Sequence, residues 1–456
     1  MTLTIYFDQS SKALYIQIYE QIKQLIQSQQ LVEGSKLPSK RLLANQLQVS
    51  IHTVQIAYEQ LTAEGFISSR ERSGYYVAPF LDEWRIKIFP KQEEVIIKDV
   101  LDSIDIDFNS GQIAYDHFPF KYWKKITNNL MRTDMTYQSP WQGERSLREQ
   151  ICQYVYLSRG VSCTVEQIYI CNGTQSQLSL LCRYFGPTAS VGFEEPGFSR
   201  AYSIFNQYRM NIVSIPVDAL GMSIPEEPLS LLYTTPAHQF PLGMIMPIQR
   251  RYALLQWALQ TDAYIIEDDY DSEFRYIGKP IPSLHSLDYQ DRVIYFGTFS
   301  KALLPSLRIS YMILPNELVN DFNDFYTELK STVSRIDQLS IAEFMKQGHW
   351  DKHLGKMRTL YRKKRDILVT QLKLKLGENV QVIGENAGLH LIIHLKLNIS
   401  EASAIKRGME CGVKIYSVSH YYHTSPKNTL LLLGYGGLNE EQITDGINRL
   451  ANAWRD

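Results

Sequence analysis

Apolar side chains recur every three or four residues in three short stretches near the start of the chain. The stretches span residues 14–26, 42–47 and 54–61. Such spacing places the apolar residues on one face of a helix, so it predicts three helices in succession. Ser39 and Ser50 stand before the second and third stretches, where each can cap a helix N-terminus.

An alternating pattern follows the third helix, which ends at Glu64-Gly65. Phe66-Ile67 and Gly74–Val77 flank a polar turn that holds two arginines. Alternation on both sides of a polar turn is typical of a β-hairpin. Three helices followed by a two-stranded wing make a winged helix-turn-helix, so we expect residues 1–79 to form a DNA-binding domain.

The composition changes after residue 79. Residues 80–105 hold more acidic than basic side chains, and Pro90 interrupts them. This composition predicts a linker that is extended or partly helical. At about 3.3 Å per residue the linker could span up to roughly 80 Å.

The pattern of residues 106–456 predicts an α/β body in two parts. In the large part, about 106–320, we expect a mainly parallel sheet covered by helices. A long helical stretch from Leu329 to Phe344 follows, and a smaller α+β part covers about 345–456. Within that smaller part, residues 387–390 and 431–435 are predicted to be strands.

Composition fits a folded protein of several domains. With 456 residues and 44% hydrophobic content, the chain can bury a sizeable core. It has no apolar run of about 18 residues and begins without a signal segment, so we expect a cytoplasmic protein with no membrane partner. The cysteines are odd in number and form no Cys-x-x-Cys pair, which predicts reduced, buried packing residues and no metal site.

Charge supports DNA binding only if the cations are clustered. Residues 1–80 carry seven basic and six acidic side chains, and the whole chain carries a net charge of −1. The predicted third helix holds no Lys or Arg, so base reading would fall to its polar side chains. The candidate DNA contacts are Lys36, Ser39, Lys40, Arg41, Ser50, His52, Thr53, Gln55, Arg70, Arg72 and Gly74. We expect weak binding by one module and specific binding by a dimer on two half-sites; the alternative is a solvated helix face in a protein-interaction domain.

The stretch Gly297–Lys301, followed by Arg308, combines the groups that bind pyridoxal 5'-phosphate (PLP). PLP needs an amine beside its aldehyde, with hydroxyls and a guanidinium fixing its phosphate. Lys301 is the predicted Schiff-base lysine, and Thr298, Ser300 and Arg308 are the predicted phosphate ligands. A solvated loop is the alternative for this segment taken alone.

Two further segments complete the predicted cofactor site. The apolar run before Asp268 and Tyr270 indicates the carboxyl end of a buried parallel strand. Asp268 can pair with the protonated pyridine nitrogen, and Tyr270 can donate to the ring hydroxyl, although such a segment alone is often a turn or a helix cap. The segment containing Gly173, Thr174 and Gln175 predicts a glycine turn and helix start that can cradle phosphate.

The first eighty residues resemble the GntR DNA-binding domain. Leu37–Arg41 matches its Leu-Pro-Ser-x-Arg turn, Val49–Val54 matches the start of its recognition helix, and Glu64-Gly65 matches its hinge. Ile51 departs from the pattern, because the family usually has arginine there. The body resembles the fold type I aminotransferases, and nearly the whole chain resembles the MocR subgroup of GntR regulators.

The resemblance implies roles for further residues. Phe198 matches the aromatic residue that stacks on the pyridine ring, and Tyr137 matches the tyrosine that reaches the phosphate of the partner subunit in a homodimer. Phe240 stands where aminotransferases carry an asparagine that binds the ring oxygen, a contact that His238 or Gln239 would have to replace. Leu432 stands where these enzymes carry an arginine that grips the substrate carboxylate.

The missing arginine favours a sensor over an enzyme. The chain is identified as a transcription regulator in which PLP, or an amine adduct of it, is the effector. The resemblance makes vitamin B6 synthesis or amino-acid and amine metabolism genes plausible targets. The alternatives are an active PLP-dependent aminotransferase with an accessory DNA-binding domain, and a cofactor-free dimerisation scaffold.

Overall fold

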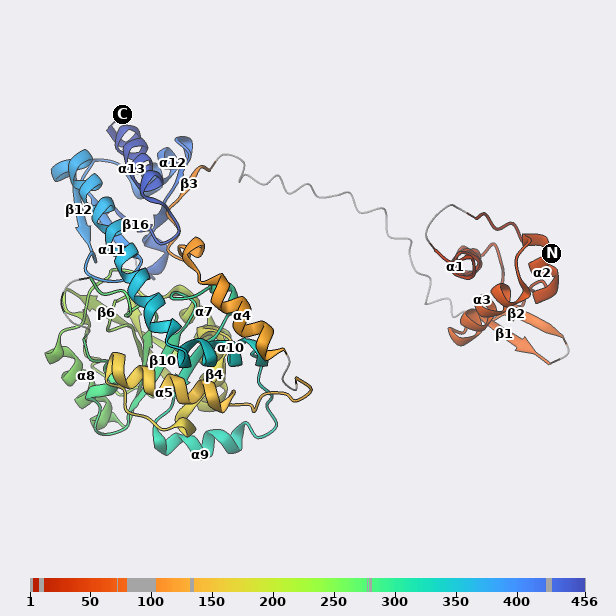
Figure 1. Cartoon of the computed structure of the whole chain (residues 1–456), viewed down its shortest axis with the longest axis horizontal. Helices are drawn as coiled ribbons and strands as arrows, with labels where there is room; N and C mark the ends of the chain where they lie inside the picture. The colour runs from red at the N-terminus through yellow and green to blue at the C-terminus, as the bar shows by residue number, and fades with distance from the viewer. Residues whose placement is uncertain are drawn as a thin grey trace. The chain divides into compact units, whose positions relative to one another are not determined.

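The protein is described by a computed structural model that covers residues 3–7, 12–71, 73–79, 104–131, 135–276, 278, 281–423 and 429–455. The chain divides into two compact units, residues 1–99 and 100–456 (Figure 1). Arg72 and residues 80–103 of the predicted linker lie outside the described residues.

The first unit is a winged helix-turn-helix, as the sequence predicts. Its elements are α1 (Leu14–Gln27), α2 (Lys40–Leu47), α3 (Ile51–Ala63), β1 (Ile67–Arg70) and β2 (Gly74–Val77). The strands β1 and β2 pair in antiparallel fashion to form the wing. The side chain of Ser39 accepts a hydrogen bond from the backbone N–H of Leu42 at 3.2 Å, and Ser50 accepts one from Thr53 at 3.1 Å. Both predicted N-caps are therefore present.

The core of the first unit fixes α3 against the turn before α2 and against the wing. Ile18, Ile22 and Leu61 are fully buried between α1 and α3. Tyr58 is also fully buried, and its hydroxyl donates to the carbonyl of Pro38 at 3.0 Å. Its ring meets that of Tyr75 edge-on, with the centroids 4.9 Å apart. One side chain thus joins the recognition helix to both of its neighbours.

The second unit is built on an eight-stranded sheet in the order β4-β11-β10-β9-β8-β5-β6-β7. In chain order the strands are β4 (Ile168–Cys171), β5 (Ser190–Glu195), β6 (Asn211–Asp218), β7 (Gly221–Met222), β8 (Leu231–Thr234), β9 (Tyr264–Asp269), β10 (Val293–Thr298) and β11 (Ser310–Ile313). The strands from β10 through β6 are parallel, whereas β11 and β7 run antiparallel to their neighbours. The carboxyl ends of β8, β9 and β10 therefore meet at one edge.

Helices cover both faces of this sheet. Alternate residues of each strand enter different apolar clusters: Ile265 packs in the cluster that contains α8, and Ile266 packs in the one that contains α6 and α7. One face carries α5 (Arg145–Arg159), α8 (Ile248–Thr261) and α10 (Arg335–Lys346), and the other carries α6 (Thr174–Phe185), α7 (Ser199–Gln207) and α9 (Asn316–Phe325). The predicted parallel sheet between helical layers is confirmed (Figure 1).

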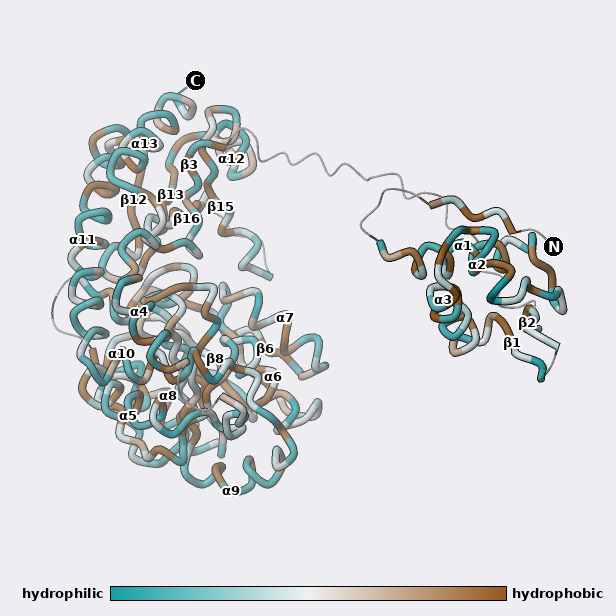
Figure 2. The backbone as a smooth tube through the Cα atoms, turned by 45° about the vertical axis from the view of Figure 1, so that its right-hand side comes forward, coloured by the Kyte–Doolittle hydropathy of each residue, from teal (hydrophilic) through white to brown (hydrophobic). Residues whose placement is uncertain are grey.

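A smaller part completes the second unit. Its antiparallel sheet has the order β12-β13-β16-β15, and hydrophilic and hydrophobic stretches alternate along its long helix α11 (Figure 2). The remaining elements are β3 (Ile106–Asp107), α4 (Phe120–Leu130), α11 (His349–Leu376), β12 (Val380–Ile383), β13 (His390–Leu395), α12 (Glu401–Glu410), β14 (Val413–Lys414), β15 (Tyr416–Ser417), β16 (Leu430–Gly434) and α13 (Glu440–Arg455). Among the described residues no helix is both long and apolar enough to cross a bilayer.

Three details differ from the sequence predictions. The expected continuous helix from Leu329 to Phe344 is wrong, because α10 begins only at Arg335. The strand expected at residue 387 begins at His390, since Gly388 has the left-handed φ of 74° and ends the preceding turn. All the cysteines are free, but only two are buried; Cys152, Cys163 and Cys411 are half-buried.

Candidate cofactor site and DNA-binding surface

The alternation of side chains along β9 separates its two terminal aspartates. Asp268 lies on the face of Ile266, and Asp269 lies on the opposite face, where its Oδ2 accepts a hydrogen bond from Arg159 Nε of α5 at 2.7 Å. Successive residues of a strand point to opposite faces, so only one of the two can serve a ligand on a given side. Asp269 is held by an arginine, which leaves Asp268 for the other face.

The Asp268 carboxyl group is buried and accepts a hydrogen bond from the neighbouring strand β8. The hydroxyl of Tyr233 on β8 donates to its Oδ2 at 2.5 Å. Burial raises the pKa of Asp268 to about 7, and the Tyr233 hydrogen bond opposes part of that rise. A cationic N–H placed beside this carboxylate would relieve the cost of burying its charge, which is the role that a protonated pyridine nitrogen can fill.

We expect Asp268→Asn to stabilise the cofactor-free protein increasingly as the pH rises. An acid whose pKa increases from 3.8 unfolded to about 7 folded destabilises the native state as the pH rises between these values. At about 1.4 kcal/mol per pKa unit, the substitution should add at most about 4 kcal/mol at pH 8 and little at pH 4. The difference in unfolding free energy between variant and wild type checks this in urea titrations at the two pH values. A difference that does not change with pH would contradict it.

Lys301 follows β10 at the same edge of the sheet. Its Nζ donates to the backbone carbonyl of Ser110 at 2.6 Å. Burial lowers the pKa of Lys301; Asp271 raises it, and the positive charge of Arg200 lowers it further. A lowered pKa increases the fraction of neutral amine, the form that attacks a carbonyl carbon.

Arg308 and the start of α6 form a candidate anion site. Arg308 is exposed, its Nη2 donates weakly to the carbonyl of Asn172 at 3.5 Å, and its guanidinium lies where a Cβ on Gly173 would be. Gly173 is the N-cap of α6 and provides no side-chain cap, so the first turn, with Thr174 and Gln175, faces the guanidinium. A helix N-terminus beside an arginine attracts phosphate.

The two predicted hydroxyl ligands, Thr298 and Ser300, come just before the lysine in the sequence. Thr298 and Ser300 are both half-buried, and Thr298 Oγ1 accepts a hydrogen bond from the backbone N–H of Ser300 at 3.1 Å. The turn that presents Lys301 is therefore held by Thr298 itself.

Tyr270 contacts a histidine that also contacts an aspartate. His238 Nδ1 lies 3.0 Å from the Tyr270 hydroxyl and 3.0 Å from Asp271 Oδ2. His238 Nε2 is buried with no hydrogen-bond partner among the described residues. Of the two residues expected to replace the missing asparagine, His238 thus lies beside Tyr270. Gln239 does not, because its amide donates to Glu194 and to nearby backbone carbonyls.

The same histidine belongs to a group of possible metal ligands. Ligand atoms of His238, Asp271 and His390 all lie within 4.8 Å of one another. His390 Nε2 lies 3.0 Å from the carbonyl of Pro241, and burial lowers the pKa of His390 to about 3. These three residues could hold a divalent ion, although the sequence predicted no metal site; their hydrogen bonds also suit the positioning of Tyr270.

Aromatic side chains connect Phe198 to this group. The Phe198 ring, at the N-cap of α7, meets Phe240 edge-on with centroids 5.5 Å apart, and Phe240 meets Tyr270 at 6.0 Å. Phe198 is half-buried and therefore has a surface open to a ligand. Tyr137, in contrast, is 69% exposed, and no hydrogen bond or ring contact of the described residues joins it to the other candidates.

Sequence reasoning missed four residues of the site. Tyr233, Ser110, Asp271 and Arg200 contact or act on the predicted ligands. Ser110 and Arg200 are far from Lys301 in the sequence and join it only through the fold. Asp271 adjoins Tyr270, so its position next to a predicted ligand is the one signal that could have identified it.

The predicted DNA-binding cations of the first unit gather along the wing. Lys36 and Arg70 lie 5.8 and 4.4 Å from the ring centroid of Tyr76, and Lys40 lies 5.9 Å from that of Tyr75. Arg41 is exposed on α2. Gly74 has a φ of 111°, which lets β2 begin against Lys36. The turn before α2 and the wing therefore bring Lys36, Lys40 and Arg70 close to the neighbouring rings of Tyr75 and Tyr76.

The base-reading candidates of α3 differ in whether they already form side-chain hydrogen bonds within the protein. The hydroxyls of Ser50 and Thr53 lie 2.8 Å apart as part of the N-cap, and Gln55 donates to Glu59 at 2.7 Å. His52 is exposed. Gln55 would have to exchange Glu59 for a base edge before it could read adenine.

We expect Arg70→Gln to weaken binding to any DNA duplex by a similar factor. A phosphate contact carries no sequence information, and its loss lowers the slope of log affinity against log salt by about 1. Fluorescence anisotropy with two unrelated duplexes at several salt concentrations measures this, with Lys12→Gln, just before α1, as a control for the lost charge. An unchanged slope would place Arg70 outside the DNA contact.

The two units define a class: a DNA-binding regulator with an aminotransferase-like body. Residues 103–450 match the family Aminotransferase class I and II, and residues 14–77 match Bacterial regulatory proteins, gntR family. A kynurenine aminotransferase of Pyrococcus horikoshii, solved in complex with PMP, shares the fold of the body with a TM-score of 0.71 and 26% identity, over 82% of this chain and 97% of that chain.

Relatives span the whole chain. An uncharacterized HTH-type transcriptional regulator of Bacillus subtilis, YdeL, is 45% identical over 97% of both chains. The probable rhizopine catabolism regulatory protein MocR of Rhizobium meliloti is 31% identical over 97% of this chain and 94% of its own. The pyridoxine biosynthesis transcriptional regulator PdxR of Corynebacterium glutamicum is 31% identical over 96% and 95%. The chain belongs to the MocR subfamily of GntR-type transcriptional regulators.

Proposed function

We propose that this regulator binds PLP covalently through Lys301 and uses the cofactor, or an amine that combines with it, as its effector. One observation carries the proposal: Asp268, Lys301 and Arg308 come from β9, the end of β10 and the β10–β11 connection, at one edge of the sheet. They supply a carboxylate for the pyridine nitrogen, an amine for the carbonyl carbon and a guanidinium for the phosphate. When bound, PLP supplies an electrophilic carbonyl carbon.

The remaining candidate residues would orient the cofactor. The hydroxyl of Tyr270, held by His238, would meet the ring oxygen, and Phe198 would cover the ring face. Thr298, Ser300 and the first turn of α6 from Gly173 would add donors for the phosphate, with Thr174 and Gln175 in that turn. In a homodimer the exposed Tyr137 would reach the phosphate of the other subunit.

A sensor suits the site better than an enzyme. Leu432 is 1% exposed on β16 and packs with Leu242 and Ile392, so no guanidinium stands there. Arg200 is exposed at the start of α7 and acts on the pKa of Lys301. It is a candidate partner for an anionic group of an amine effector.

The DNA-binding side of the proposal rests on the distribution of cations. The first unit has few free base-reading groups, so a cytoplasmic homodimer on two half-sites would supply the specificity. The likeness to a pyridoxine biosynthesis regulator supports genes of vitamin B6 metabolism as targets, with amino-acid or amine metabolism as the broader class.

Absorption spectroscopy of the full-length protein with PLP tests the proposal. We expect a visible absorption band, cofactor that borohydride fixes on Lys301, and a change in DNA affinity when PLP is added. A band without any change in DNA binding would reject the effector role, and the absence of a band would reject covalent binding. Repeated conversion of amino acids or amines would instead make the protein a transaminase.

A further inference from the structure

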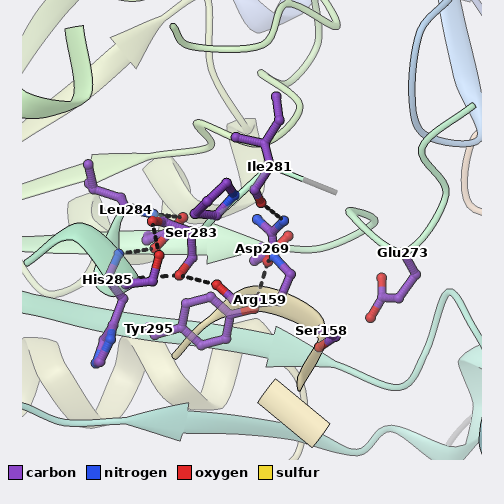
Figure 3. A network of polar contacts seen from close by, with 12 residues as sticks. Ser158, Arg159, Asp269, Glu273, Ile281, Ser283, Leu284, His285 and Tyr295 are labelled. Atoms are coloured by element: carbon purple, nitrogen blue, oxygen red, sulfur yellow. Dashed lines mark hydrogen bonds and ion pairs between the residues drawn. The ribbon is translucent and has the colours of Figure 1, made fainter. Parts of the chain in front are cut away.

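A cavity of about 750 Å³ lies on the face of the sheet that carries α5, and Lys301 is not among its lining residues. Its walls come from α5, the corner between α10 and α11, and the loop after β9. Figure 3 shows part of this region, with Ser158, Arg159 and Glu273 around Asp269. The volume is within the range of small-molecule sites, roughly 300–1,000 Å³.

The cavity walls carry an excess of unpaired positive charge. Four lining cations have no carboxylate within 4.0 Å in the described part of the chain: Arg275, Lys346, Arg358 and Arg362. The two acidic residues in the lining are Glu273 and Asp351. The fifth lining cation, Arg159, is neutralised by its pair with Asp269 at 2.7 Å. An anion entering the cavity would therefore meet more positive than negative groups.

Glu273 is fixed at the cavity wall by two hydrogen bonds. The hydroxyl of Tyr154 donates to the carboxyl oxygen of Glu273 at 3.0 Å, and Arg358 Nε donates to its backbone carbonyl at 2.9 Å. The Glu273 side chain is thus held in place, and the cavity lining still has five basic residues against two acidic ones.

One wall of the cavity is aromatic and apolar, and it contains a buried donor with no acceptor. Tyr154 and Trp350 meet edge-on with centroids 5.5 Å apart, next to Met345 and Leu354. Trp350 is 2% exposed, and its Nε1 has no hydrogen-bond partner among the described residues. Arg159 Nη2 is likewise buried with no hydrogen-bond partner among the described residues. A buried donor without an acceptor costs free energy, which a ligand bearing acceptor atoms could recover.

We propose that this cavity is a second ligand site, for a small organic anion that carries a carboxylate or phosphate on an aromatic or apolar body. Arg275, Lys346, Arg358 and Arg362 would bind the anionic group. Tyr154 and Trp350 would contact the body, with the Trp350 indole N–H as a donor.

The loop after β9 joins this cavity to the cofactor site. Tyr270 and Asp271 face His238, whereas Ser272 and Glu273 line the cavity. An occupant would therefore contact the loop that also holds Tyr270. A role of this occupant as an effector rests on the proposed function, but its binding does not.

Isothermal titration calorimetry on the full-length protein tests the site with phenyl phosphate, phenylacetate and uncharged benzyl alcohol as probes. We expect one site per chain for at least one anion, no binding of the alcohol, and at least tenfold weaker binding in Arg358→Gln/Arg362→Gln. The matched control is Lys352→Gln/Lys356→Gln, which removes two exposed charges of the same helix outside the cavity. If the double variant does not fold, Lys346→Gln at an exposed position should weaken binding of the anion on its own.

Arg308→Gln separates this site from the cofactor site. Binding that persists in Arg308→Gln and is lost in Arg358→Gln/Arg362→Gln supports the cavity. Binding that is lost in Arg308→Gln, or that is equal in all the variants, overturns it, as does the absence of binding by both anions. None of these outcomes depends on whether Lys301 reacts with PLP.

Discussion

Replacing Lys301 with alanine should abolish covalent PLP binding completely. Lys301 Nζ is the amine at the sheet edge shared by Asp268 and Arg308, and its lowered pKa favours the neutral nucleophile. We expect no visible absorption band, no cofactor fixed by borohydride, and no response of DNA binding to PLP. Binding of DNA without PLP should remain within about twofold of wild type, because the first unit is unchanged.

Lys364 provides a demanding control for this experiment. It is also buried, its Nζ donates to the carbonyl of Gly436 at 2.9 Å, and burial lowers its pKa to about 8. The candidate phosphate site of Arg308 and Gly173 belongs to the proposed site of Lys301 and not to Lys364. We therefore expect Lys364→Gln to keep the visible absorption band. A borohydride-fixed cofactor on Lys364, or a Lys301→Ala protein that still responds to PLP, would show that Lys301 is not the attachment point.

Asp269→Asn should destabilise the second unit by about 3–5 kcal/mol, the usual cost of breaking a buried ion pair from one side. Arg159 and Asp269 side chains are 7% and 1% exposed, and the hydroxyl of Tyr295 donates to the same Asp269 oxygen at 2.6 Å (Figure 3). The substitution leaves a buried guanidinium without its counter-charge. Urea unfolding of the full-length protein, followed by a signal of the second unit, measures the loss.

The pair of half-buried Arg250 and exposed Asp218 is the matched control. Its N–O distance of 2.8 Å is similar, but Asp218 is 47% exposed. Asp218→Asn should therefore cost less than about 1 kcal/mol. Equal losses in the two variants would mean that burial does not govern the strength of the Arg159–Asp269 pair.

The sequence predicted those features that depend on local spacing. The N-caps Ser39 and Ser50 were predictable because a hydroxyl before an apolar helical pattern meets the free N–H groups of the first turn. The positions of Asp268 and Lys301 were predictable, because Asp268 lies at the carboxyl end of one buried parallel strand and Lys301 follows another. Their roles toward PLP stay predictions until the cofactor is measured.

Features that depend on packing between distant segments were not predictable. Tyr233 reaches Asp268 because β8 and β9 are neighbours in register, and apolar periodicity does not specify that order. Ser110 accepts from Lys301 across 191 residues of sequence. The cavity beside Trp350 is likewise absent from any motif, because its walls come from α5, α10, α11 and one loop.

A small rotation at the start of the long helix α11 would produce a large displacement at its far end. It has 28 residues, or about 42 Å at 1.5 Å per residue, and it begins after Gly348, which has a left-handed φ of 71°. A rotation of about 10° there would displace the far end by roughly 7 Å. That end packs against α13, whose Arg449 pairs with Asp105, and β3 at residues 106–107 pairs with β14. Movement of the small part would therefore move the point from which the chain leads to the DNA-binding unit.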